Sequence, residues 1–373
     1  SRPIVWLKLV QMRLRSSFLL CFLASFLPLR GLKPPSRPSF IACLNSSASP
    51  RSKDLSKLFF ACLDAHQQIC IPEATIMVPG HPWGFGSAIN TWVQSFAYAL
   101  QQGLTWLPGH GFLYVDPQRC TGRTASLGCY FERVTPCTKS KLPPEKAGNY
   151  LRKRQTLIAR VACLLKVPRD WVVGHLTAYM LRMRTDVDKL VRERIPHGMS
   201  SLSHYAALQV RHAVGRALTT DLRGSQSQIP VERLIGFLQQ LDTSGCTSRG
   251  ARACRQTQDI YVLTDNEAVT EAWLSSQFSG YRFWQPSRSV HDPGHWHSVG
   301  KDNVVMPAYE REIPMRNVTY DLLADLWAAV RSDIFIGCWS NMFWLVYALR
   351  QTGVGGAGAS CYVDTQGPVT PMR

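Results

Sequence analysis

The second half of the chain alternates between two hydrophobic patterns. Short apolar runs of strand length, each closed by a polar residue, precede stretches in which apolar residues recur every three or four positions. These runs lie within residues 203–212, 260–265 and 333–341. Because strands that alternate with helices are typical of a parallel sheet, we predict an α/β domain over about residues 202–351.

The same two patterns predict a first folded half over about residues 54–196. The predicted elements are helices at 88–100, 150–165 and 169–194, and strands at 104–107 and 112–115. Gly103 is expected to end the first helix, because glycine readily adopts the left-handed conformation found there.

Polar residues follow the three strands of the second half: Arg211, Asp265, and Ser340 with Asn341. In open α/β sheets, ligands bind outside the carboxyl ends of the strands. A guanidinium group suits a pyrophosphate, and the N–H groups at a helix N-terminus suit a phosphate. This arrangement predicts an enzyme that uses a phosphate-bearing donor.

Each of these residues also has a simpler interpretation. Arg211 would form a surface ion pair, although its place between a buried strand and Gly215 favours a ligand. Asp265 and Ser340 would cap the helices that follow them. For Ser340 the two roles are compatible, because one hydroxyl at a helix N-terminus can serve both.

Asp325 is unusual because it lies in a strongly apolar helical segment, residues 320–330. A carboxylate there can accept two hydrogen bonds from the N1 and N2 edge of guanine. Alternatively, it faces solvent on the polar side of the helix together with Asp321.

Composition excludes several classes of protein. The 373 residues, 45% of them hydrophobic and 18% charged, are enough for two globular domains. A net charge of +17 would attract nucleic acid, acidic lipid or a nucleotide-sugar donor. No lysine-rich stripe, zinc-finger spacing or aromatic RNA-binding signature accompanies that charge, so we expect no nucleic-acid partner.

The N-terminal segment is typical of secretory proteins. Residues 1–29 combine basic residues with a short apolar core, which predicts a cleaved signal peptide or a short signal anchor. Residues 30–55, rich in proline and serine, predict a stem. Twelve cysteines and two glycosylation sequons, at Asn45 and Asn317, fit the same compartment, and Cys246 could pair with Cys254.

Two further motifs carry little weight. The three histidines within residues 291–297 are separated by proline and glycine, which favours an exposed loop over a metal site. Gly84 and Gly86 lack the third glycine and the preceding strand of a dinucleotide-binding fingerprint.

In order and spacing, the motifs resemble those of the α1,6-fucosyltransferases that use GDP-fucose. The resemblance runs patchily from Cys62 to Tyr347. The segments that carry it are Cys62 with Cys70, residues 84–90, 131–137, 171–179 and 208–212, Thr264 with Asp265, residues 323–333 and residues 338–341.

This resemblance implies a GT-B-like α/β fold, in which two Rossmann-like domains face a cleft. It implies an acceptor-side domain at 56–200, a donor domain at 201–352 and a flexible tail at 353–373. It also implies a Cys62–Cys137 disulfide and catalysis without a metal or cofactor. The implied donor-binding residues are Gly84, Gly86, Gln209, Arg211, His212, Asp265, Asp325, Ser340 and Asn341.

The chain also departs from the family pattern. Gln209 stands where the family usually has histidine, and Asp221 is the nearest carboxylate to the expected catalytic base. With Arg211 and Asp221 as catalytic residues, the leading hypothesis is an inverting transfer of fucose from GDP-fucose to a glycan in the Golgi or secretory-pathway lumen. The alternatives are a non-catalytic GDP- or glycan-binding relative and a protein O-fucosyltransferase-like enzyme.

Overall fold

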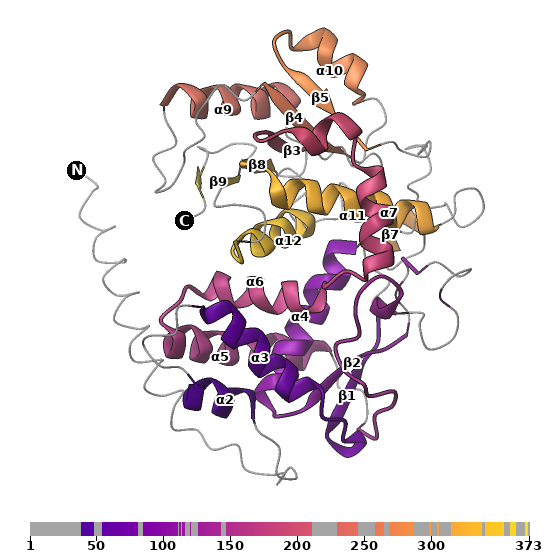
Figure 1. The fold of residues 1–373 in the computed structure, drawn as a ribbon, viewed down its shortest axis with the longest axis vertical. Coiled ribbons are helices and arrows are strands. Elements are labelled where there is room, and N and C mark those ends of the chain that lie inside the picture. Colours follow the sequence, from indigo (N-terminus) through magenta and orange to yellow (C-terminus); the bar gives the residue numbers. More distant parts are fainter. Residues whose placement is uncertain are drawn as a thin grey trace. The chain divides into compact units, whose positions relative to one another are not determined.

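The computed structural model describes residues 39–47, 54–80, 85–110, 112, 114–115, 120, 126–142, 147–210, 230–244, 258–264, 269–286, 298–299, 304–305, 315–337, 340–353, 359–362 and 370–371. The chain divides into two compact units (Figure 1). The first is Ser1–Val78, Trp92–Leu107 and Arg133–Tyr179; the second is Pro79–Thr91, Pro108–Glu132 and Met180–Arg373. Two early segments therefore belong to the second unit, whereas the sequence predicts consecutive domains at 56–200 and 201–352.

The first unit is mainly helical in the part of the chain that the structure describes. Its elements are α2 (Phe40–Ser47), α3 (Leu55–Gln67), η1 (Pro72–Ala74), β1 (Thr75–Val78), β2 (Thr105–Pro108), α5 (Ala147–Leu165) and α6 (Arg169–Met180). Strands β1 and β2 form a two-stranded sheet. Helix α4 (Phe85–Gln101) contributes to both units, since the division falls after Thr91. Gly103, with φ at 69°, follows the end of α4 as predicted.

The second unit contains the remaining described elements. They are η3 (Leu127–Cys129), α7 (Thr185–Arg194), η4 (His197–Ser201), β3 (Ala206–Val210), α9 (Val231–Ser244), β4 (Asp259–Thr264), α10 (Glu271–Gln277), β5 (Arg282–Trp284), β6 (Ser298–Val299), β7 (Val304–Val305), α11 (Met315–Arg331), β8 (Ile334–Gly337), α12 (Asn341–Arg350), β9 (Ala359–Tyr362) and β10 (Thr370–Pro371).

The described strands of the second unit include a six-stranded sheet in the order β10-β9-β8-β3-β4-β5. All neighbours are parallel except β10 with β9. Counted along the chain from β3, the parallel strands follow the order 3-2-1-4-5, which is that of Rossmann-like domains. The predicted α/β class is therefore confirmed, and the order of the strands reverses between β3 and β8.

The two faces of this sheet are covered by different helices (Figure 1). Helix α9 packs on the face formed by alternate strand residues such as Leu208, Val262 and Ile336, all of which are buried. The opposite face meets α11 and α12, where the ring of Phe335 stacks on Phe343 at 5.3 Å. Burial on both faces explains why β3, β4 and β8 are nearly continuous apolar runs in the sequence.

The prediction of a flexible tail over residues 353–373 is wrong for the part that the structure describes. Strand β9 extends the sheet beside β8, with Ile336 opposite Cys361, and β10 then pairs with β9. An uncovered β8 edge would expose unpaired N–H and C=O groups, and β9 satisfies them.

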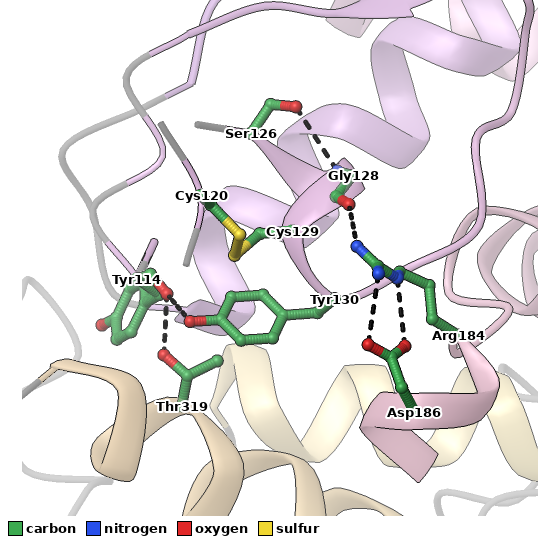
Figure 2. The surroundings of a disulfide bond; sticks show 9 residues. All are labelled: Tyr114, Cys120, Ser126, Gly128, Cys129, Tyr130, Arg184, Asp186 and Thr319. Carbon is green, nitrogen blue, oxygen red and sulfur yellow. Dashed lines mark hydrogen bonds and ion pairs between the residues drawn. A yellow bond between two sulfur atoms is a disulfide. The ribbon is translucent and has the colours of Figure 1, made fainter. Parts of the chain in front are cut away.

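The predicted strand at 112–115 is also wrong: Phe112, Tyr114 and Val115 are described and lie outside any strand. Side chains bind the backbone carbonyl of Tyr114, which a neighbouring strand would need for pairing (Figure 2). The carbonyl oxygen of Tyr114 accepts from the hydroxyls of Tyr130 at 2.7 Å and Thr319 at 2.8 Å. Burial of both aromatic rings produced the alternation that suggested a strand.

The predicted helix at 169–194 is interrupted between α6 and α7. Met183 pairs with Phe131 as an isolated antiparallel bridge, and Arg184 is extended, with ψ at 143°. The Arg184 guanidinium then contacts Asp186 in the first turn of α7, as Figure 2 shows. The bridge to Phe131, which is distant in the sequence, therefore interrupts the helix that the apolar spacing predicts.

The disulfides correct another expectation. Among the described residues, Cys43 bonds to Cys62, Cys70 to Cys137, and Cys120 to Cys129, so a Cys62–Cys137 bridge is wrong. Cys62 lies on the part of α3 that packs on α2, where Phe40 meets Phe59 at 5.3 Å. The predicted Cys246–Cys254 pair and residues 1–29 lie outside the described residues. Where the structure describes helices, none has the length and apolarity to cross a membrane.

Arg350 stabilises the second unit from inside the core. Its guanidinium is buried and donates to the carbonyls of Ala329 and Val330 in the last turn of α11, and to that of Asp333 just beyond the helix. The carbonyls of Ala329 and Val330 have no partner within the helix, because they lie in its last turn. We expect Arg350→Met to lower the free energy of unfolding by about 3 kcal/mol in urea denaturation, because it removes several charged donors at once.

A matched control is Arg192→Met on α7, which removes an exposed ion pair to Asp188. That change should cost at most about 0.5 kcal/mol. Equal effects of the two substitutions would contradict the capping role of Arg350.

In the first unit, a buried histidine should make stability depend on pH. His175 Nδ1 donates to the carbonyl of Trp171 at 2.8 Å, so Nε2 accepts from the hydroxyl of Ser56 at 2.8 Å. Burial lowers the pKa of His175 below its usual 6.5. The unfolded chain therefore binds a proton near pH 6.5 that the folded chain does not, and stability is lost as the pH falls through that value.

We expect the free energy of unfolding to decrease as the pH is lowered from 7.5 to 5.5. In the His175→Gln variant, the same change of pH should lower the free energy of unfolding by less. The measurement is urea denaturation at each pH without reductant. If the variant follows the same pH dependence as the unchanged chain, the assignment is wrong.

Candidate donor site

The candidate site lies where the strand order of the sheet reverses. Gln209, near the carboxyl end of β3, is the register partner of Gly337, which ends β8. Ser340 and α12 follow within a few residues. A reversal of strand order is where ligands bind in open α/β sheets, because the connections on either side lead away in opposite directions.

Ser340 caps α12, as its position in the sequence predicts. Its backbone is extended, with φ at −154° and ψ at 164°, and its Oγ accepts from the N–H of Phe343 at 3.0 Å. The same oxygen accepts from Nε2 of Gln209 at 2.8 Å. The helix end therefore presents N–H groups and a polar cluster to the edge of the sheet, which suits a negative charge.

The start of α4 lies against this helix end. A Cβ atom on Gly86 would come within 2.8 Å of the backbone carbon of Asn341 and the nitrogen of Met342. Asn90 Nδ2 donates to Oδ1 of Asn341 at 3.1 Å, and Asn341 Nδ2 donates to the hydroxyl of Ser87. Glycine at position 86 thus allows two helix N-termini to approach each other closely.

Helix α4 begins at Phe85, three residues earlier than the hydrophobic spacing predicts. The N–H of Phe85 donates to the hydroxyl of Tyr114 at 2.9 Å, and burial raises the pKa of that phenol to about 12. Tyr114 therefore stays neutral and satisfies one of the N–H groups that the helix leaves open.

Asp325 is buried, and the solvent-facing alternative is wrong. Its Oδ1 accepts from the hydroxyl of Tyr261 on β4 at 2.8 Å. Asp321 is also buried and pairs with Arg194 at 2.8 Å. Tyr261 is the register partner of Ala207, two residues before Gln209, so Asp325 and Gln209 lie on the same face of the sheet.

The structure therefore brings together Gly86, Gln209, Ser340 and Asn341, and places Asp325 on the same sheet face. Gly84, Arg211, His212, Asp221 and Asp265 lie outside the described residues. Within the described part, no group of three His, Cys, Asp or Glu side chains could hold a metal ion.

Sequence reasoning missed three contributors: Ser87, Asn90 and Tyr261. The asparagine lies in the helix predicted at 88–100 and the serine directly precedes it, where polar residues are ordinary. The tyrosine reads as one more buried aromatic of a strand. Only the contacts to Asn341 and Asp325 distinguish these residues.

Comparison with known proteins finds similarity at the level of structure. No protein-family model and no curated protein matches the chain. The chain is similar to NodZ α1,6-fucosyltransferase co-crystallised with GDP, with a TM-score of 0.46 and 14% identity over 81% of this chain and 99% of that chain. It is also similar to the apo form of POFUT1, with a TM-score of 0.40 and 12% identity over 79% of this chain and 99% of that one.

A third similar structure is a variant of Arabidopsis thaliana FUT1 in complex with GDP. There the TM-score is 0.43 and the identity 13%, over 89% of this chain and 80% of that chain. NodZ belongs to the α1,6-fucosyltransferases, the class of enzyme that the sequence motifs of this chain resemble.

Proposed function

We propose that this chain is an inverting glycosyltransferase that transfers fucose from GDP-fucose to a glycan acceptor. The observation that carries the proposal is the cluster at the reversal of strand order, where Ser340 caps α12 beside Gln209. A diphosphate at that place would meet N–H groups, a hydroxyl and the positive end of a helix dipole. We name GDP-fucose as the donor because the order of the sequence motifs resembles that of the α1,6-fucosyltransferases.

Departure of GDP is the step that this cluster would assist. As the bond between C1 of fucose and the phosphate oxygen breaks, its electron pair stays on GDP and negative charge grows there. The N-terminus of α12, Ser340 and Arg211 would stabilise that charge, which is the kind of electrostatic stabilisation that lowers such barriers most.

The acceptor hydroxyl would attack C1 from the face opposite GDP, which inverts the configuration. Its proton must leave as the new C–O bond forms, and Asp221 is our candidate for the base. The buried carboxylate of Asp325 would accept hydrogen bonds from N1 and N2 of guanine. Gly84, His212, Asp265 and Asn341 complete the proposed donor site.

The cellular setting is proposed on separate grounds. Disulfides such as Cys43–Cys62 and Cys70–Cys137 persist in oxidising compartments, which fits the Golgi or secretory-pathway lumen. We propose an acceptor-side domain at 56–200, a donor domain at 201–352, a signal peptide or short anchor at 1–29 and transfer without a metal.

The decisive experiment is a transfer assay with GDP-fucose and a panel of acceptors: N-glycans, chitin oligomers and folded cysteine-rich domains. Transfer to either kind of glycan supports the proposal, and transfer to a folded domain identifies a protein O-fucosyltransferase-like enzyme. GDP binding without transfer to any acceptor would indicate a non-catalytic relative. Transfer from another nucleotide sugar in place of GDP-fucose would overturn the choice of donor.

A further inference from the structure

The side chain of Gln209 is buried more deeply than an ordinary amide at a strand end. It is 9% exposed, and its Nε2 donates to Ser340. Its Oε1 has no hydrogen-bond partner among the described residues. A buried polar atom without a partner destabilises the fold, so a glutamine at this place calls for an explanation.

The hydrogen bonds at Ser340 supply one. A hydroxyl has two lone pairs and a single proton. Both lone pairs of Oγ are used, by the Nε2 group of Gln209 and by the N–H of Phe343. The proton of Ser340 must therefore point away from both of these groups. In this way Gln209 makes a hydroxyl that could either donate or accept into a hydrogen-bond donor at the start of α12.

The backbone leaves room for this amide. A Cβ atom on Gly337 would come within 2.9 Å of Oε1 of Gln209 and of Cδ2 of Phe343. Any larger residue at the end of β8 would displace the amide or the ring. The close approach of β3 and β8 at their carboxyl ends thus fits a glutamine that reaches Ser340.

We infer that Gln209 is a positioning residue, which acts through Ser340 by aiming its hydroxyl proton at the diphosphate of the donor. The inference rests on the proposed function, because it names a diphosphate as the acceptor of that proton. Gln209 would therefore favour phosphate-bearing ligands indirectly, through its hydrogen bond to Ser340.

The test compares affinities for GDP and for guanosine, which lacks phosphate, by calorimetry on the full chain. Gln209→Glu is nearly isosteric but replaces the donor by an acceptor, so the Ser340 proton would turn toward the carboxylate. We expect it to weaken GDP binding about twentyfold, and Gln209→Leu about fivefold. Guanosine affinity should change less than about twofold for both, since guanosine offers no phosphate oxygen.

A second background shows whether the effect passes through Ser340. Glycine is tolerated at helix N-caps, so Ser340→Gly removes the hydroxyl with little loss of stability. In that background, Gln209→Leu should change GDP affinity by less than about twofold.

The outcomes separate the two proposals. If the unchanged protein does not bind GDP, the proposed function fails and the role of Gln209 fails with it. If it binds GDP but Gln209→Glu binds equally well, the amide oxygen faces Ser340 and only the positioning role is overturned. Equal losses of GDP and guanosine affinity would show that Gln209 is merely structural, which also overturns the role.

Discussion

Valine in place of Gly86 should weaken GDP binding about a hundredfold and lower the free energy of unfolding by about 3 kcal/mol. The cause is steric. Even a Cβ atom at this position would come within 2.8 Å of backbone atoms of Asn341 and Met342. Backbone cannot yield as a flexible side chain does, so the start of α12 must move away from α4.

The loss of GDP affinity follows from that movement. The N–H groups of α12 and the Ser340 hydroxyl act on a phosphate only at hydrogen-bond distance. A shift would also strain the contacts of Asn341 with Ser87 and Asn90. Calorimetry with GDP measures the affinity, and urea denaturation measures the stability.

Gly236 provides the matched control, because it also lies in a helix, α9, and a Cβ atom added to it would meet nothing within 4 Å. Gly236→Ala should raise the free energy of unfolding by about 0.5–1 kcal/mol and leave GDP affinity unchanged. If Gly86→Val binds GDP as tightly as the unchanged protein, the start of α12 does not hold the diphosphate.

The close approach at Gly86 also marks the limit of what the sequence could predict. The strands β3, β4 and β8 were predictable because burial on both faces makes each one a continuous apolar run. The cap at Ser340 was predictable because it depends only on the residues beside it. By contrast, Asn90 contacts Asn341 across 251 positions of sequence, which no local pattern encodes.

Pairings between distant segments account for the errors as well. The number of cysteines predicts disulfides, yet the packing of α2 on α3 decides that Cys62 meets Cys43. The glycine-rich stretch before β9 suggested a tail, whereas the uncovered edge of β8 recruits that strand into the sheet. Local periodicity cannot rank such partners, because their energies depend on the complete fold.

The same distinction applies to Asp325. Its place in an apolar helix suggested a role for the carboxylate, with exposure to solvent as the alternative. The structure buries it against Tyr261 on the face of the sheet that carries Gln209. If the proposed donor site is correct, a buried carboxylate that accepts from the Tyr261 hydroxyl is well placed to distinguish purine bases.

Asp325→Asn should therefore weaken the binding of both GDP and guanosine about a hundredfold. An amide presents one acceptor and one donor, and the donor would oppose the N–H groups of guanine. Because the defect lies at the base, the ratio of GDP to guanosine affinity should stay constant, in contrast to the variants of Gln209. Competition with inosine, which lacks the N2 group, should become almost as effective as competition with guanosine.

Asp321→Asn is the control, since Asp321 is equally buried on the same helix but pairs with Arg194. Removing that charge should lower the free energy of unfolding by about 2 kcal/mol and leave GDP affinity within about twofold. Tyr261→Phe deletes the hydroxyl that orients Asp325 while keeping the carboxylate, and should weaken GDP binding about fivefold. If Asp325→Asn binds guanosine as tightly as the unchanged protein, Asp325 does not belong to the donor site. A carboxylate that accepts hydrogen bonds from guanine cannot lose its charge without an effect on affinity.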